Sequence, residues 1–437
     1  MDRHKSLYLQ KQMTAQEIAE QVQPGWNCFT DIAAAVPVAI MDAIGERASD
    51  PAWMSRTSEV RWNAMLDLEP LKVLDRSVNG ILPVTWFSGA GLRKAVNESR
   101  GDVMPCYYRD VPGLIREHQR VEAVFACVSP MDKHGFFSTG CSASYSEVIL
   151  EKAEKIYLEV NDRMPRAPGG PQIHISQVTA LCENSRALPV LPAAKPDEVS
   201  TAIGNYIAEE IPDGAVLQLG IGSVPEAVGN ALTGKKDLGI HTELLTDSMV
   251  RLIECGAVTN ERKPIHRGKT VATLAFGSQR IYDYIDDNPS VLMLPVDYVN
   301  NPEVISKMPD FISVNAALEV DFFGQVCAES MGIRHISGSG GQADYVRGAV
   351  LSPGGKSFIA FPSTAKNGTV SRIVSTLSTG ALVTTSKNDV DYIVTEYGIA
   401  RLRGKTLRER TQALIAVAHP KFREQLTFDA KARGILL

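Results

Sequence analysis

The chain has 437 residues, which is enough for two or three domains with substantial cores. Hydrophobic residues make up 44% and charged residues 22%, the composition of an ordinary globular enzyme. The formal net charge of -5 excludes a global attraction to nucleic acid or to an anionic membrane. An anionic substrate must therefore be held locally, by Lys, Arg and backbone N–H groups.

The cysteines and the N-terminus limit the compartment and the metal chemistry. The seven cysteines form no CxxC pair, and their spacing matches no zinc site. Their odd number and apolar surroundings predict reduced core residues in a cytoplasmic protein without a metal site. Residues 1–5 lead into a polar helix, and the apolar runs are too short to span a bilayer. We therefore expect no membrane span and no nucleic-acid partner.

A segment near the N-terminus recurs in the second half of the chain. Residues 18–25 (IAEQVQPG) return as residues 207–214 (IAEEIPDG), and each copy continues as turn, strand, loop, proline and helix. A chance match of one short segment is the alternative, but we interpret the recurrence as a duplication. It predicts an α/β fold of two related domains, residues 1–195 and 196–437, with mainly parallel sheets.

Apolar runs bounded by turn residues predict strands, and their alternation with helical spacing predicts parallel βαβ units. The expected strands cover residues 121–130, 155–160, 291–295, 356–361 and 381–385. Residues 312–315 and 317–321 have the pattern of a hairpin. Residues 407–418 have the spacing of an amphipathic helix.

The two copies differ at the turn that follows their first strand. The first half has residues 30–35 (TDIAAA) there, and the second half has residues 219–224 (LGIGSV). Only the second turn allows a ligand to approach the backbone closely, so the first half is expected to supply only the walls of the binding site. A tight turn that needs small residues only for packing is the alternative. The N–H groups that would suit a phosphate or an oxyanion belong to Gly220, Ile221, Gly222, Ser223 and Val224.

Two further turns are candidates for ligand contact. Residues 338–341 include three glycines, Gly341 among them, which again allows close approach, although a flexible surface turn would look the same. Lys366 lies in a polar turn after a strand and can hold a phosphate as a point charge. Most loop lysines are merely solvated, which is the alternative here.

The stretch 239–248 (GIHTELLTDS) has the pattern of a strand end, a carboxylate, a turn and a helix start. Open α/β sheets keep their chemistry at such places, which makes Glu243 the candidate nucleophile, with a solvated loop glutamate as the alternative. His241 is interpreted as structural. Glu396 is the competing carboxylate, and its basic neighbours in 401–405 predict a salt-bridged surface cluster.

Taken together, these motifs resemble the class I coenzyme A (CoA)-transferases of the acetyl-CoA hydrolase/transferase branch, over essentially the whole chain. The marks in the first half are residues 128–130 (VSP), 134–135 (HG), 164–166 (MPR) and 173–177 (IHISQ). The marks in the second half are residues 220–222 (GIG), 239–243 (GIHTE), 341–344 (GQAD), 362–366 (PSTAK) and 394–398 (VTEYG). The likeness is greatest to the 4-hydroxybutyrate, butyrate and itaconate CoA-transferases. Residues 109–113 (RDVPG) depart from the common family form, in a region that the resemblance implies shapes the acid pocket.

The resemblance implies two similar α/β domains with the active site between them, and no cofactor beyond CoA as a substrate. It places the nucleophile at Glu243, the CoA-contacting turn at residues 220–224, and further CoA contacts at Gly341 and Lys366. The implied reaction moves CoA between a short-chain acyl-CoA and a carboxylate, in ping-pong steps through a glutamyl-CoA thioester. A homo-oligomer is implied as well.

Three other functions are compatible with parts of the pattern. An acyl-CoA hydrolase would use the same glutamate and release CoA without an acceptor acid. A nicotinamide oxidoreductase would use the glycine turn for pyrophosphate, but Pro225 stands at the third glycine position and a suitable ribose-binding acid is lacking about twenty residues on. A non-catalytic CoA-binding protein would form no covalent adduct.

Overall fold

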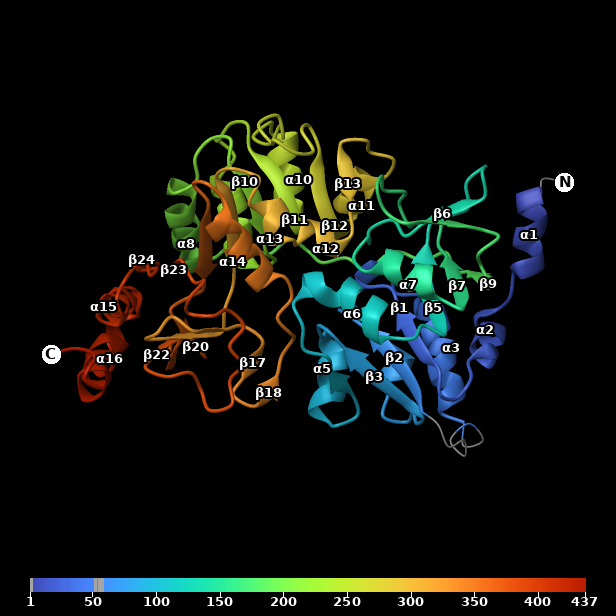
Figure 1. The fold of residues 1–437 in the computed structure, drawn as a ribbon, viewed down its shortest axis with the longest axis horizontal. Coiled ribbons are helices and arrows are strands. Elements are labelled where there is room, and N and C mark those ends of the chain that lie inside the picture. Colours follow the sequence, from blue (N-terminus) through green and yellow to red (C-terminus); the bar gives the residue numbers. More distant parts are fainter. Residues whose placement is uncertain (1–2, 51–52, 54–58) are drawn as a thin grey trace. The chain divides into compact units, whose positions relative to one another are not determined.

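The computed structural model describes residues 3–50, 53 and 59–437, which form two compact α/β units (Figure 1). Unit 1 comprises Met1–Leu191 and Ala272–Tyr298, and unit 2 comprises Pro192–Val271 and Val299–Leu437. The units differ from the expected contiguous halves, 1–195 and 196–437, because residues 272–298 belong to unit 1.

Unit 1 is built on a parallel sheet with the strand order β4-β3-β2-β1-β5-β7-β9. These strands are β1 (Asn27–Thr30), β2 (Val60–Ala64), β3 (Ile81–Thr85), β4 (Asp102–Val103), β5 (Ala123–Val128), β7 (Lys155–Val160) and β9 (Ala180–Glu183). The helices are α1 (Arg3–Lys11), α2 (Ala15–Gln21), α3 (Val38–Ala48), α5 (Ala90–Asn97), α6 (Val111–His118) and α7 (Ser146–Lys152). Every residue of β5 is buried, as expected for a central parallel strand that is covered on both faces.

Two further parts complete unit 1. Strands β6 (Phe136–Ser138) and β8 (Gln172–His174) form an antiparallel pair. The segment from the second half of the chain carries most of β12 (Thr270–Ala275), then α11 (Gln279–Ile285), β13 (Val291–Met293) and most of α12 (Val296–Val299).

Unit 2 contains strands in the order β11-β10-β14-β19-β23-β24, parallel except for the last pair. These strands are β10 (Val216–Leu219), β11 (Gly239–Leu245), β14 (Phe311–Asn315), β19 (Lys356–Ala360), β23 (Tyr392–Thr395) and β24 (Gly398–Arg401). The helices are α8 (Glu198–Glu209), α9 (Ser223–Ala231), α10 (Asp247–Glu254), α13 (Pro302–Ile305), α14 (Gln342–Leu351), α15 (Leu407–Val417) and α16 (Pro420–Ala432). The short strands are β15 (Glu319–Asp321), β16 (Val326–Cys327), β17 (Ser330–Met331), β18 (Arg334–His335), β20 (Thr364–Ala365), β21 (Val370–Ser371) and β22 (Ile373–Val374).

The topology of the two units agrees with a duplication. In unit 1 the order runs β2-β1-β5-β7-β9, and in unit 2 the order runs β11-β10-β14-β19-β23. The recurring helix-turn segments end in the same backbone conformation, with φ of 82° at Gly25 and 83° at Gly214. Eight residues further along, Ala33 and Gly222 also both have positive φ, of 56° and 117°.

The turn after β1 differs from its counterpart after β10 in chemistry. Asp31 stands in unit 1 where the repeat places Gly220 in unit 2. Its buried carboxylate accepts hydrogen bonds from the Ile32 N–H (2.8 Å) and from the hydroxyls of Ser142 (2.7 Å) and Ser146 (2.9 Å). The N–H of this bend is therefore already bound to an anion that belongs to the chain.

Two strand predictions are wrong. Residues 312–315 form no hairpin with 317–321, because β14 lies between β10 and β19 in the parallel sheet and β15 pairs with β16 and β22. Residues 381–385 form no strand, since only Thr385 makes a single bridge, to Val326. An apolar run without a burying partner does not become a strand, and β-propensity alone did not reveal this.

The cysteines and helices qualify two other expectations. Most of the cysteines are buried as predicted, but Cys255 is exposed and Cys106 is half-buried. In the described ranges, the helices are all too short or too polar to cross a bilayer. The expected helix over 407–418 is confirmed as α15, and α16 follows it directly at Pro420.

Candidate active site

Glu243 lies inside β11, two residues before the strand ends, rather than in the turn that follows. Strand β11 is parallel to β10, with Leu217 paired to Ile240. If this register is continued along both strands, Gly220 falls beside Glu243. The carboxylate and the glycine turn therefore share the carboxyl edge of one parallel sheet, where such folds bind ligands.

Two donors hold the carboxylate of Glu243. The side-chain nitrogen Nδ2 of Asn300 lies 2.7 Å from Oε2, and the backbone N–H of Gly341 donates a second hydrogen bond. Gly341 is the N-cap of α14, so the carboxylate lies at the positive end of a helix. A Cβ atom at position 341 would lie 1.9 Å from Oε2, which leaves room only for glycine.

Burial raises the pKa of the Glu243 carboxyl group to about 7, against the two hydrogen bonds, which lower it. The side chain is nevertheless only half-buried, so a substrate can reach it. The group is thus partly ionised at neutral pH, a perturbation that is common among functional carboxylates.

The orientation of Asn300 is set from a second direction. Its side chain is fully buried, and its Oδ1 accepts a hydrogen bond from the hydroxyl of Tyr345 at 3.1 Å. Tyr345 is the fourth residue of α14, the helix that begins after Gly341. The sequence interpretation did not identify either residue, because nothing in the local pattern around Asn300 marks it as more than the residue before the cap of α13.

His241 is structural, as interpreted. Its Nε2 lies 2.7 Å from the carbonyl oxygen of Val299, so this nitrogen carries the proton. Burial, followed by the neighbouring Lys263, lowers the pKa of His241 to about 3, so the ring is neutral at pH 7. The contact ties β11 to the residue before Asn300.

The glycine turn is open backbone at the start of a helix. Gly222 is the N-cap of α9 with a φ of 117°, and a Cβ atom there would meet no neighbour within 4 Å. The Ile221 side chain is exposed, whereas Val224 is buried and packs inward. The Ser223 hydroxyl accepts a hydrogen bond from Ser200 at 2.9 Å. Gly220 donates its own N–H to the carbonyl oxygen of Val314 at 3.1 Å, so this N–H is already used within the fold.

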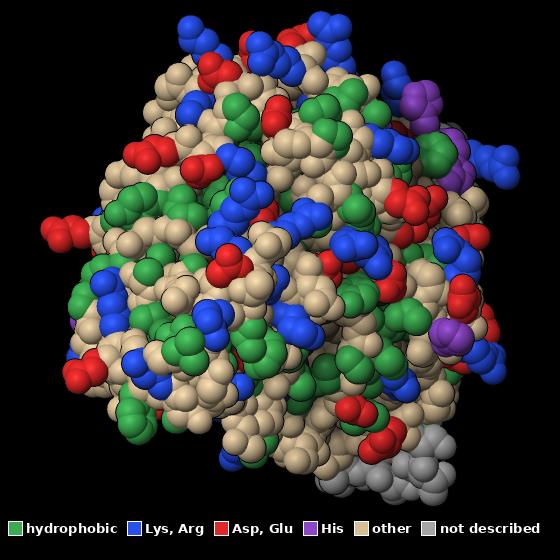
Figure 2. Space-filling view, turned by 60° about the vertical axis from the view of Figure 1, so that its left-hand side comes forward, with side chains coloured by type: hydrophobic (Ala, Val, Ile, Leu, Met, Phe, Trp, Pro, Cys, Tyr) green, Lys and Arg blue, Asp and Glu red, His purple; other side chains and the backbone are tan. Residues whose placement is uncertain are grey.

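Lys366 is exposed in a turn beyond β19, with a left-handed backbone (φ 48°). Its ammonium group makes no hydrogen bond or ion pair with any residue that the structure describes. Figure 2 shows Lys and Arg side chains gathered across the middle of the face that it presents, despite the net charge of -5. Exposure leaves the Lys366 ammonium accessible to solvent, and its contact with CoA stays a prediction.

The salt-bridged cluster predicted around Glu396 is wrong. Its carboxylate accepts hydrogen bonds from the N–H (2.8 Å) and the hydroxyl (2.5 Å) of Ser363. Arg401 instead lies over the ring of Tyr392, and Arg403 donates to the carbonyl of Val350. In the antiparallel pair β23 and β24, Arg401 is opposite Tyr392, at the end of the hairpin away from Glu396.

Comparison with known proteins identifies the family. Residues 1–192 match the model of the acetyl-CoA hydrolase/transferase N-terminal domain, and residues 277–430 match that of the C-terminal domain. The chain belongs to the acetyl-CoA hydrolase/transferase family.

Individual relatives of this family are similar over most of their length. The chain is 51% identical to the succinyl-CoA:cyclohexane-1-carboxylate CoA transferase of Geobacter metallireducens, over 79% of each chain. It is 48% identical to the 4-hydroxybutyrate coenzyme A transferase of Clostridium kluyveri, over 79% of this chain and 81% of that one. The crystal structure of RipA from Yersinia pestis matches with a TM-score of 0.92 and 37% identity, over 100% of both chains.

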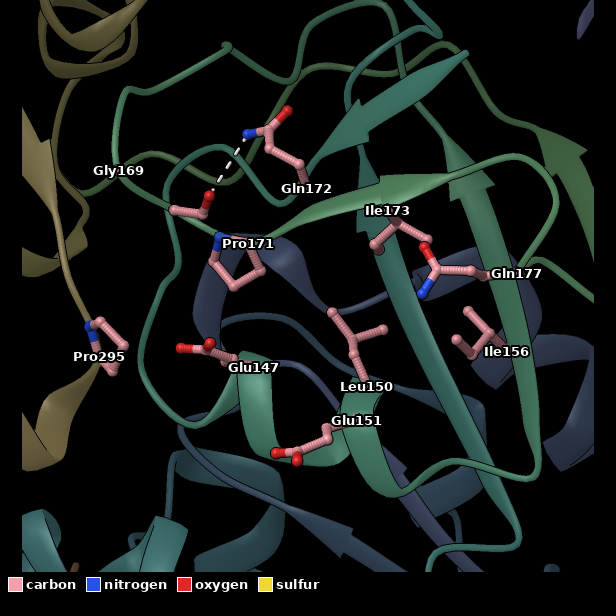
Figure 3. A pocket seen from close by; sticks show the side chains of 11 residues that line it. Glu147, Leu150, Glu151, Ile156, Gly169, Pro171, Gln172, Ile173, Gln177 and Pro295 are labelled. Carbon is pink, nitrogen blue, oxygen red and sulfur yellow. Dashed lines mark hydrogen bonds between the residues drawn. The ribbon is translucent and has the colours of Figure 1, made fainter.

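A cavity in unit 1 of this acetyl-CoA hydrolase/transferase family member contains none of the predicted site residues. It encloses about 460 Å³, and Figure 3 shows Glu147 and Glu151 of α7 on one side and Gln172 on the other. Two carboxylates do not suit a ligand rich in phosphate. In the part of the chain that the structure describes, no group of three or more His, Cys, Asp or Glu could hold a metal ion.

Proposed function

We propose that this chain, a CoA-transferase acting between acyl-CoA and carboxylates, carries CoA as a covalent thioester on Glu243. One observation carries the proposal: a reachable carboxylate with a pKa of about 7 is held by two hydrogen-bond donors, Asn300 Nδ2 and the Gly341 N–H. A solvated surface glutamate would have neither the donors nor the raised pKa.

The reaction proceeds by exchange of acyl bonds. The Glu243 carboxylate attacks the thioester carbonyl and expels the CoA thiolate, which gives a mixed anhydride. The thiolate then attacks the glutamyl carbonyl, releases the first acid as a carboxylate and leaves a thioester on Glu243. The acceptor carboxylate repeats both steps in reverse. Bonds broken and formed are of the same kind, so the reaction uses no metal, ATP or cofactor beyond CoA itself.

The donors around Glu243 stabilise the negative charge that develops in each step. An oxyanion on the glutamyl carbon would accept hydrogen bonds from Asn300 Nδ2 and the Gly341 N–H, and one such donor is worth ~3 kcal/mol in the transition state. The phosphates of CoA would bind the N–H groups of residues 221–224 at the start of α9 and the ammonium of Lys366. Binding energy from these distant groups can order the site and exclude water.

The acids exchanged are proposed to be short-chain carboxylates. The resemblance suggests 4-hydroxybutyrate, the pair butyrate and acetate, or the pair itaconate and succinate. The relative named for cyclohexane-1-carboxylate adds a cyclic acid to test. A panel of these acceptors with acetyl-, butyryl- and succinyl-CoA as donors ranks the pairs by kcat/KM.

Chemical trapping tests the covalent step. Incubation with butyryl-CoA followed by borohydride should reduce the glutamyl thioester, and peptide mass spectrometry should locate the change at Glu243. Glu243→Ala should abolish transfer, and Glu243→Asp should leave traces, because the carboxylate is withdrawn by about one methylene. Glu396→Gln is the matched control. A modified residue other than Glu243 would refute the assignment, and CoA release without an acceptor acid would favour a hydrolase.

A further inference from the structure

The amide of Asn300 has two possible orientations, and only one suits the proposed chemistry. With Nδ2 towards Glu243, as observed, the amide donates to Oε2 at 2.7 Å. With the amide turned over, its oxygen would face the glutamate oxygen. The carboxylate, the anhydride and the thioester of Glu243 all present an oxygen that only accepts hydrogen bonds, so the donor orientation is needed throughout.

Tyr345 supplies the contact that selects this orientation. Its hydroxyl donates to Oδ1 of Asn300 at 3.1 Å, on the side of the amide opposite Glu243. The ring is buried and stacks on Phe311, with centroids 6.1 Å apart and an angle of 17° between the planes. Tyr345 therefore has little freedom to follow the amide if it rotates.

We propose that Tyr345 is a positioning residue, which acts through Asn300 to keep a hydrogen-bond donor directed at Glu243. This inference rests on the proposed function of Glu243. One helix, α14, then controls both donors, because the N–H of Gly341 precedes its first residue and the ring of Tyr345 projects from its fourth. A displacement of this helix would weaken both contacts together.

Loss of the Tyr345 hydroxyl has a consequence for protonation. An unrestrained Asn300 can turn its oxygen towards Glu243 once the glutamate is protonated, which stabilises the acid form and raises its pKa. The groups that act on the Glu243 pKa are Asn300 and the Gly341 N–H, and no charged side chain of the described residues contributes. His241 on the same strand is neutral at pH 7.

Tyr157 offers a closely matched control. It is fully buried, stacks on Phe125 with centroids 5.1 Å apart and an angle of 13°, and donates its hydroxyl to the side-chain amide of Gln21 at 3.0 Å. It lies on β7 in unit 1, whereas Glu243, Asn300 and Gly341 belong to unit 2. Tyr157→Phe removes the same kind of bond from the same kind of packing.

The test compares Tyr345→Phe with Tyr157→Phe, after thermal unfolding confirms that both are folded. Tyr345→Phe should lower kcat about tenfold, the effect of one hydrogen bond, with the KM for acyl-CoA unchanged. It should also move the acid limb of kcat/KM to higher pH. In an Asn300→Ala background, Tyr345→Phe should have no further effect. Tyr157→Phe should match the wild type in kcat, in the KM for acyl-CoA and in the pH profile.

The outcomes separate this role from the proposed function. If the wild type transfers CoA and Tyr345→Phe matches it in kcat and pH profile, or if its effect multiplies with that of Asn300→Ala, the positioning role is refuted. If the wild type forms no adduct on Glu243, the proposed function fails instead. The positioning role of Tyr345 is then tested by infrared titration of the Glu243 carboxyl band, which is assigned with Glu243→Gln. An equal Glu243 pKa in wild type and Tyr345→Phe would refute this role, and a higher Glu243 pKa in Tyr345→Phe would support it.

Discussion

Nδ2 of Asn300 lies 2.7 Å from Oε2 of Glu243, although 56 residues separate the two in the printed sequence. The same oxygen is 1.9 Å from the place that a Cβ atom at position 341 would occupy. A strand, a helix junction and a helix N-terminus thus converge on one carboxylate.

The pH dependence of transfer should report the ionisation of Glu243. Since burial raises its pKa to about 7, the carboxylate is protonated at pH values where an ordinary glutamate is ionised. Only the ionised form is a nucleophile, so kcat/KM should fall about tenfold per pH unit below about pH 7. Initial rates between pH 5.5 and 9, normalised to the amount of enzyme that stays folded at each pH, test this. A value of kcat/KM that stays constant down to pH 5.5 would contradict it.

Gly341→Ala should nearly abolish transfer. The added Cβ would lie 1.9 Å from Oε2 of Glu243 and 2.4 Å from Nδ2 of Asn300, so one of the two groups must leave its place. We expect a loss of at least about a hundredfold in kcat, comparable to removal of one oxyanion donor. Gly234→Ala is the control, because a Cβ there meets no neighbour within 4 Å. Equal activity of the two variants would show that the space at position 341 is not needed.

Lys366→Ala should weaken the binding of acyl-CoA and leave kcat nearly unchanged. A single exposed charge beside a phosphate contributes about 1 kcal/mol, so the KM should rise roughly fivefold at low salt and less at high salt. Lys236→Ala removes the same charge from an exposed site just before β11, at the amino edge of the sheet. A KM that rises equally in both variants would indicate a general charge effect instead.

Lys263 should make the stability of the protein depend on pH. Its buried ammonium donates to the carbonyls of Ile240 (2.8 Å) and Lys269 (2.7 Å), and burial lowers its pKa to about 7. Between about pH 7 and 10 the unfolded chain binds a proton that the folded chain has released. The free energy of unfolding should therefore rise with pH, by up to about 1.4 kcal/mol per unit from this group.

Urea denaturation between pH 7.5 and 9.5 measures that slope. Lys263→Met should remove it, whereas Lys236→Met, at an exposed position, should retain it. A slope that is unchanged in Lys263→Met would mean that this lysine titrates alike in the folded and unfolded chains.

The sequence revealed the parts of the site that are local in the chain. Glu243 and the turn at Gly220 could be found because each follows a short apolar strand, and their proximity follows from parallel pairing. Asn300 and Tyr345 could not be found, because their roles exist only where a helix junction meets the start of another helix. The hairpin predicted after Phe311 failed for a related reason, since local alternation does not specify which distant strand will cover an apolar face.

The carboxylate of Asp31 has a wider consequence. In unit 1 this carboxylate, held by Ser142 and Ser146, fills the bend, whereas glycine stands at the matching position of unit 2. The duplication of the fold therefore does not give two CoA sites. A calorimetric titration with CoA should saturate at one equivalent per polypeptide.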